Sequence, residues 1–212
     1  MKLSPQLLVF DLGRVLLHID VDRCYRTYSD LGIPSHYEIS LKTLFQKYES
    51  GNISEQHLLD RVNEDLGTTY TYEAFWSCWD AMIVSYDREV VSLIEDLRTN
   101  YQVVLLSNTN LRHQLVFEKM YQECFGGGLE SLFDRLFYSH ELQCSKPSPL
   151  IYEKVERALN VEGESILFFD DLKENLSAAN ERGWATQQVM EDKYAFKATL
   201  KRLIDIKKAP YN

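Results

Sequence analysis

The chain has 212 residues, of which 45% are hydrophobic and 26% are charged, a composition that excludes an intrinsically disordered protein. Its formal net charge of −9, from 23 basic and 32 acidic residues, argues against a surface that binds nucleic acid. No apolar run is long enough to cross a bilayer, and the N-terminus lacks a small-residue cleavage site, so we expect a cytoplasmic protein without a membrane partner.

The first predicted element is a short buried strand, after which the pattern becomes purely helical. The strand spans residues 7–10, and the region 20–85 shows helical periodicity with turn residues but no convincing strand. The helices expected there span residues 21–31, 37–49, 54–66 and 72–83. We therefore expect a helical domain at residues 20–85, inserted after the first strand.

Strands and helices alternate in the rest of the chain. Further strands are predicted at residues 103–106, 135–138, 166–169 and, more weakly, 185–189. Helices are predicted at residues 88–98, 150–159 and 172–182. This alternation predicts an α/β core, a Rossmann-like open parallel sheet, formed by residues 1–19 and 86–212.

Acidic residues follow two of the predicted strands. Asp11 comes directly after the first strand, and Asp170 and Asp171 end another. The carboxyl ends of parallel strands collect functional groups, and adjacent carboxylates need a compensating cation, for which Mg²⁺ is suited by its preference for oxygen ligands. The simpler alternative is that Asp171 only caps the following helix. Three acids at strand ends favour the metal site.

Two further features fit a phosphate substrate. Ser107 and Asn108 end a strand before a predicted helix, where hydroxyl and amide groups can hold phosphate oxygens, although they are also ordinary helix caps. Lys146 precedes a proline-rich helix start; alone, it would be read as a solvated lysine. With the acids, these residues provide what phosphoryl transfer through an aspartyl-phosphate requires.

These motifs resemble the haloacid dehalogenase (HAD) superfamily of hydrolases over nearly the whole chain. The segments that carry the resemblance are VFDLGRVL, LLSNTN, SKPSPLIYEKV and FFDDLKENLSAA, in that order. The start and the helical insert resemble the branch with α-D-glucose-1-phosphate phosphatases and the N-terminal phosphatase domain of epoxide hydrolase. The resemblance implies strand order 3-2-1-4-5 and a helical cap domain at residues 20–85.

The resemblance also implies a magnesium site. Asp11 would be the nucleophile and a Mg²⁺ ligand, and Gly13 would supply a backbone carbonyl to the metal. Asp171 would bind the metal directly, while Asp170 and Asn175 would orient metal-bound water or neighbouring groups.

The phosphate subsite follows from the same resemblance. Ser107 and Asn108 would hold phosphoryl oxygens, and Lys146 would bridge the phosphoryl group and the carboxylate of Asp11.

The chain departs from the family pattern at Gly13, where most HAD phosphatases carry a general-acid Asp. Losing a positioned proton donor costs about 10²–10⁴ in rate. A working phosphatase would need an easily expelled leaving group or another acid, such as His18 or Asp20, although an exposed loop histidine and a helix cap are the simpler interpretations. Arg14 could touch the substrate phosphate or a cap carboxylate, or face solvent.

Three functions remain open, and one is favoured. We expect a Mg²⁺-dependent phosphatase acting on a small phosphorylated metabolite, such as a sugar phosphate, as a monomer or homodimer. The alternatives are a weak or inactive phosphate-binding or regulatory protein and, less favoured, a haloacid dehalogenase. The dehalogenase reaction needs no metal, yet Asp170 and Asp171 are retained.

Overall fold

A computed structural model describes residues 5–49 and 52–208. The chain divides into two compact units, one formed by Met1–His18 with Ser85–Asn212 and the other by Ile19–Val84. Among the described residues, no helix has the length and apolar character needed to cross a membrane.

The first unit contains a five-stranded parallel sheet. Its strands, in spatial order, are β5 (Arg135–Tyr138), β4 (Gln102–Ser107), β1 (Leu7–Phe10), β6 (Ile166–Asp170) and β7 (Ala185–Gln188). Numbered along the chain, this is the order 3-2-1-4-5. The predicted fold class is therefore confirmed, with β1 in the centre of the sheet.

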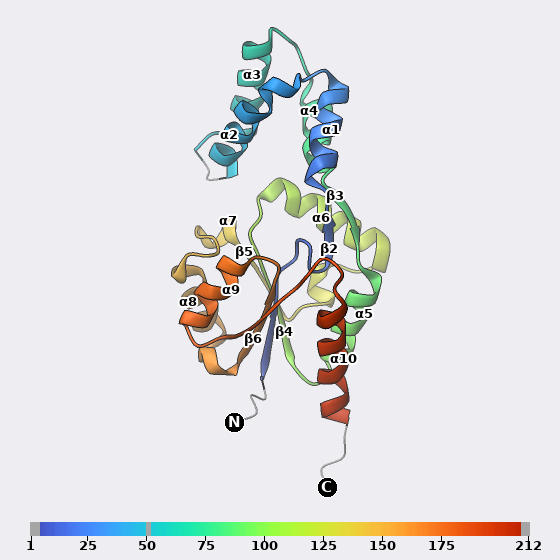
Figure 1. The fold of residues 1–212 in the computed structure, drawn as a ribbon, viewed down its shortest axis with the longest axis vertical. Helices are drawn as coiled ribbons and strands as arrows, with labels where there is room; N and C mark the ends of the chain where they lie inside the picture. The colour runs from blue at the N-terminus through green and yellow to red at the C-terminus, as the bar shows by residue number, and fades with distance from the viewer. Residues whose placement is uncertain (1–4, 50–51, 209–212) are drawn as a thin grey trace. The chain divides into compact units, whose positions relative to one another are not determined.

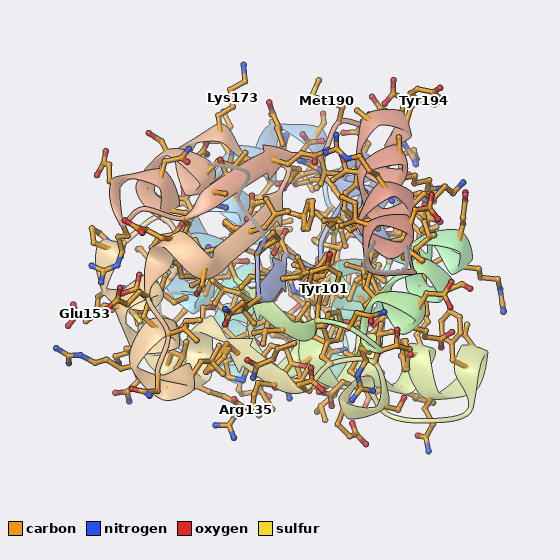
Figure 2. The ribbon with its side chains drawn as sticks, turned by 90° about the horizontal axis from the view of Figure 1, so that it is seen from below. Tyr101, Arg135, Glu153, Lys173, Met190 and Tyr194 are labelled. Carbon is orange, nitrogen blue, oxygen red and sulfur yellow. The ribbon has the colours of Figure 1, made fainter. Side chains whose placement is uncertain are left out.

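Helices cover both faces of this sheet (Figure 1). One side carries α8 (Pro149–Leu159) and α9 (Lys173–Glu181), whose apolar residues pack with Val9, Val104 and Phe168 in one core. On the other side lie α5 (Arg88–Leu97) and α10 (Tyr194–Lys208), as Figure 2 shows with Glu153 of α8 on the left and Tyr194 of α10 on the right. Helices α6 (Leu111–Phe125) and α7 (Ser139–Leu142) complete the unit. Because both faces are covered, the central strands β1, β4 and β6 are almost continuously apolar, whereas the edge strand β7 is mostly polar.

The second unit is a group of helices around an aromatic core. It comprises α1 (Val21–Leu31), α2 (Glu38–Glu49), α3 (Glu55–Leu66) and α4 (Tyr72–Asp80). Phe45 and Trp79 stack with ring centroids 3.6 Å apart, and Tyr28, Phe75 and Trp76 pack around them. The predicted helices are all present, and their starts are set by N-caps such as Ser54, which accepts a hydrogen bond from the backbone N–H of His57.

One expectation about this region is wrong. The sequence shows no convincing strand between residues 20 and 85, but β3 (Ile83–Tyr86) pairs with β2 (Leu17–Ile19) in a two-stranded sheet. The helix expected at residues 72–83 ends at Asp80 instead. Strands this short, with mixed burial, have too few residues to show a period of two.

Candidate active site

The sheet order brings three functional side chains to one edge. Strands β4, β1 and β6 are neighbours and parallel, so Ser107, Asp11 and Asp170, at or directly after their ends, share the carboxyl edge of the sheet. The backbone N–H of Asp11 donates to Phe169 O at 2.9 Å and so extends the pairing of β1 with β6 past the strand end. Ligand oxygens of Asp11, Asp170 and Asp171 all lie within 4.8 Å of one another. The structure therefore brings together the three predicted acids.

Lys146 reaches this cluster from the segment between α7 and α8. Its Nζ donates to Asp11 Oδ1 at 2.7 Å, to Asp170 Oδ2 at 2.8 Å and to the carbonyl of Leu106 at 2.9 Å. An ammonium group has three protons, so its hydrogen bonding is complete. Lys146 is 4% exposed, and such a buried amine is tolerated because it is paired and hydrogen-bonded.

Burial and mutual repulsion shift the titration of the cluster. Burial raises the pKa of Asp11 to about 7, Lys146 opposes this rise, and Asp170 adds to it. Burial and the neighbouring Asp170 also raise the pKa of Asp171. Burial acts to lower the pKa of Lys146, but Asp11 and Asp170 outweigh it and hold this pKa above its ordinary value. Three carboxylates face the ammonium group of Lys146 and the more exposed guanidinium of Arg14, which leaves an excess of negative charge that a divalent cation would offset.

The set of carboxylate oxygens fits Mg²⁺, and the adjacent acids Asp170 and Asp171 differ in how far their oxygens are already engaged. Mg²⁺ prefers oxygen ligands, and each of the three acids offers a carboxylate oxygen within 4.8 Å of the other two. Both oxygens of Asp170 already accept hydrogen bonds, Oδ1 from Leu172 N and both from Asn175 Nδ2. The Asp171 carboxylate has a long ion pair with Arg14, at 3.5 Å, so it is freer than Asp170 to bind a cation. Within residues 5–49 and 52–208, no contact joins the Gly13 carbonyl to these acids, and its role as a metal ligand stays a prediction.

Asn175 and the start of α9 support Asp170. Asn175 Nδ2 lies 3.0 Å from each carboxylate oxygen of Asp170. The backbone carbonyl of Asn175 accepts a hydrogen bond from the Tyr152 hydroxyl at 2.8 Å. The N-cap of α9 is Leu172, without a side-chain cap, so the alternative that Asp171 caps this helix is wrong. The nearest to a cap is Asp170, which accepts from Leu172 N.

The two predicted phosphate ligands differ in what they contact. Ser107 ends β4 beside the acids and is 3% exposed, and in the described part of the chain no side-chain hydrogen bond engages its hydroxyl. The Asn108 side chain is engaged: its Nδ2 donates to Lys146 O at 2.8 Å, and its Oδ1 accepts from Lys146 N at 2.9 Å. The sequence offered no signal for this contact, because residues 108 and 146 are far apart in the chain and one partner is backbone.

Three residues weighed as substitutes or substrate contacts lie in different settings. Arg14 has a left-handed backbone, with φ of 57°, and its exposed guanidinium lies 3.5 Å from Asp171 Oδ2. His18 is exposed on β2, so it is a strand residue rather than a loop residue; burial and Lys193 lower its pKa. Asp20 is the N-cap of α1, as its simpler interpretation had it.

Known proteins of similar sequence and structure include enzymes. A D-ribitol-5-phosphate phosphatase of Bacteroides thetaiotaomicron is 28% identical over 85% of this chain and 90% of its own length. A crystal structure of a HAD family enzyme from the same organism, in complex with magnesium and inorganic phosphate, aligns with a TM-score of 0.81 and 26% identity, over 89% of this chain and 96% of that one. A HAD-like hydrolase of Porphyromonas gingivalis aligns with a TM-score of 0.79 and 26% identity, over 94% and 98%.

Dehalogenases resemble the chain more distantly. An (S)-2-haloacid dehalogenase of a Pseudomonas species is 28% identical, but over 56% of this chain and 50% of its own length. The haloacid dehalogenase-like hydrolase family model matches residues 6–183, a range that holds every described strand except β7, together with the insert, the acids and Lys146. With this match added to the sheet order and the acid cluster, the chain belongs to the haloacid dehalogenase-like hydrolase family, as its motifs predict.

Proposed function

We propose that this protein is a Mg²⁺-dependent phosphatase that hydrolyses a small phosphomonoester through an aspartyl-phosphate on Asp11. One observation carries the proposal: three carboxylates, of which Asp11 and Asp170 are buried, meet one buried, saturated ammonium group at the carboxyl edge of the sheet, with an excess of negative charge. The magnesium and phosphate in the similar Bacteroides thetaiotaomicron structure and the phosphatase activity in the name of the similar protein support the same reading.

The chain's own residues would perform two displacements. An Asp11 oxygen attacks phosphorus; the new P–O bond forms as the bond to the substrate oxygen breaks, and that oxygen leaves with the electron pair and takes a proton from water. A second water then adds its oxygen to phosphorus, which releases inorganic phosphate and a proton and restores the Asp11 carboxylate.

The surrounding groups would orient these steps and stabilise the charge that develops. Lys146 holds Asp11 Oδ1 by a 2.7 Å hydrogen bond, so the other carboxylate oxygen of Asp11 would be the one that attacks phosphorus. The positive charge of Lys146 would also stabilise negative charge on the phosphoryl group. The Ser107 hydroxyl would donate to a phosphoryl oxygen. When bound, Mg²⁺ would neutralise charge on the phosphoryl oxygens and carboxylates and hold them together.

The substrate is proposed to be a sugar phosphate or a related polyol phosphate. A similar protein is named for D-ribitol 5-phosphate, and the acidic chain suits a small metabolite better than a polyanion. We further propose that the helical region 20–85 acts as a cap that supplies substrate contacts and excludes water. The protein would work as a monomer or homodimer.

Gly13 favours one alternative, a phosphate-binding or regulatory protein with little turnover. No carboxylate stands at this position to protonate the leaving group, and the pKa of His18 is lowered, which leaves His18 mostly neutral at pH 7. This alternative shares the fold and the metal site with the phosphatase, so only turnover separates the two.

A metabolite phosphatase panel tests the proposal. p-Nitrophenyl phosphate, hexose phosphates including an anomeric phosphate, and pentitol phosphates are assayed with Mg²⁺ and with EDTA. We expect Mg²⁺-dependent release of phosphate, lowered more than about a thousandfold by Asp11→Asn. Asp134→Asn is the matched control, because Asp134 pairs with Arg98 directly before β5, at the opposite edge of the sheet. Turnover in EDTA or in Asp11→Asn would contradict the mechanism, and phosphate binding without turnover on any substrate would support the alternative.

A further inference from the structure

The side chain of Asn108 grips the backbone of Lys146 at two points. Its amide nitrogen donates to Lys146 O at 2.8 Å, and its amide oxygen accepts from Lys146 N at 2.9 Å. Such a pair fixes both position and rotation of the peptide groups on either side of the lysine Cα, as one hydrogen bond would not. We call this pair the Asn108 clasp.

The other end of Lys146 is held by the same short stretch of chain. Its Nζ donates to the carbonyl of Leu106, while Asn108 holds its backbone. Leu106 and Asn108 flank Ser107, the predicted phosphate ligand at the end of β4. The end of β4 therefore fixes the positions of both the Lys146 backbone and the Lys146 ammonium group relative to Ser107.

Fixing the backbone matters because a lysine side chain is long and has many rotamers. Ordering it costs free energy, and a small shift of its Cα would move Nζ out of reach of Asp11 Oδ1 and Asp170 Oδ2, now 2.7 and 2.8 Å away. We infer that Asn108 is a positioning residue that acts through Lys146, and not a side-chain ligand of the phosphoryl group. The inference rests on the proposed function in one respect: it assumes that Lys146 interacts with a phosphoryl group.

The chain contains a matched clasp in its other unit. Asn63 Nδ2 donates to Tyr70 O at 3.1 Å, and Asn63 Oδ1 accepts from Tyr70 N at 2.8 Å and also from Thr68 Oγ1 at 3.0 Å. This second clasp fixes the turn between α3 and α4 and touches no lysine, so Asn63→Ala controls for the loss of an asparagine clasp as such.

Nuclear magnetic resonance of the ligand-free protein tests the positioning without any assumption about activity. In the wild type, the Lys146 amide should exchange slowly with solvent, and its ammonium group should give an observable nitrogen-coupled signal because it is buried and bonded. Asn108→Ala should speed the amide exchange at least about tenfold and broaden the ammonium signal, while Asn63→Ala changes neither. An unchanged ammonium signal in a folded Asn108→Ala protein would overturn the inference, even with the amide exposed.

A double-mutant cycle on binding of inorganic phosphate, with Mg²⁺ present, tests the path of action. Asn108→Ala should weaken binding about tenfold in the wild type but less than about twofold on top of Lys146→Met. Equal weakening in both backgrounds would make Asn108 a direct phosphate ligand and overturn the inference. Wild-type protein that binds no phosphate would instead count against the proposed function, and the resonance measurements would still decide the role of Asn108.

Discussion

The aromatic core of the helical unit and the charged cluster at the sheet edge are similarly buried but are stabilised in different ways. Phe45 and Trp76 are 3% and 0% exposed and are surrounded by apolar groups, so their burial favours folding directly. Asp170 and Lys146 are 0% and 4% exposed, and they are tolerated only because each is paired and hydrogen-bonded. Burial alone therefore does not identify a stabilising region; buried charge with an excess of one sign marks the functional one.

The largest expected effect comes from removing the buried ammonium group of Lys146 from the charged cluster. Lys146→Met leaves Asp11 and Asp170 buried without their partner, so we expect a loss of about 4 kcal/mol in the free energy of unfolding, and of at least about a hundredfold in turnover. Denaturant unfolding in EDTA, with activity assays in Mg²⁺, measures both. If stability were unchanged, the cluster would not be held together by this ammonium group.

Truncating a side chain of the aromatic core should lower the free energy of unfolding nearly as much, without changing any residue of the charged cluster. Phe45→Ala removes the ring that stacks on Trp79 and leaves a cavity, with an expected loss of about 3 kcal/mol. Tryptophan fluorescence during denaturant unfolding reports this loss, and Phe45→Leu should recover most of it. A loss as small as that of a surface substitution would mean that the helical unit relaxes around the gap.

Magnesium should act on one region only. When the free Mg²⁺ concentration is a hundred times the dissociation constant, binding to the folded cluster stabilises the protein by about 2.7 kcal/mol. This gain should disappear in Asp171→Asn. Thermal melts with Mg²⁺, compared with a sodium salt of the same ionic strength, measure the effect. Phe45→Ala should show the same gain as the wild type, and a different gain would show that the two regions are coupled.

The sequence predicted the elements and the gathering of acids better than the contacts that hold them. Asp11 and Asp170 could be placed at one sheet edge because apolar runs before them mark parallel strands, whose carboxyl ends meet. The engaged side chain of Asn108 and the carbonyl of Leu106 could not be foreseen, because both contacts join distant segments through backbone atoms that every residue carries. The pair β2 and β3 was missed because three or four residues are too few to show a period.

A paired carboxylate outside the site provides a comparison with the charged cluster, in which negative charge is in excess. Glu156 accepts two hydrogen bonds from Arg182 and one from Trp184 Nε1. Burial acts to raise its pKa, but these partners outweigh it and hold the pKa below 4.5. The folded-state pKa lies below the unfolded one, so the stabilisation is present above about pH 4.5 and is lost as pH falls further. Glu156→Gln should cost about 1 kcal/mol at pH 7 and progressively less below pH 4, as measured by urea unfolding across pH.

The smallest expected effect concerns Arg14, at the rim of the charged cluster. Its φ of 57° is unfavourable for a side chain with a Cβ, and its ion pair with Asp171 is long and exposed, at 3.5 Å with 56% of the arginine side chain accessible. Arg14→Gly relieves the backbone strain but loosens the unfolded chain, so stability should change by less than about 1 kcal/mol. Removing a positive charge beside Asp171 should tighten Mg²⁺ binding a fewfold, which titration calorimetry can measure. Arg14→Lys, which keeps the charge, is the control; weaker Mg²⁺ binding by Arg14→Gly than by Arg14→Lys would show that the arginine supports the metal site instead of competing with the cation.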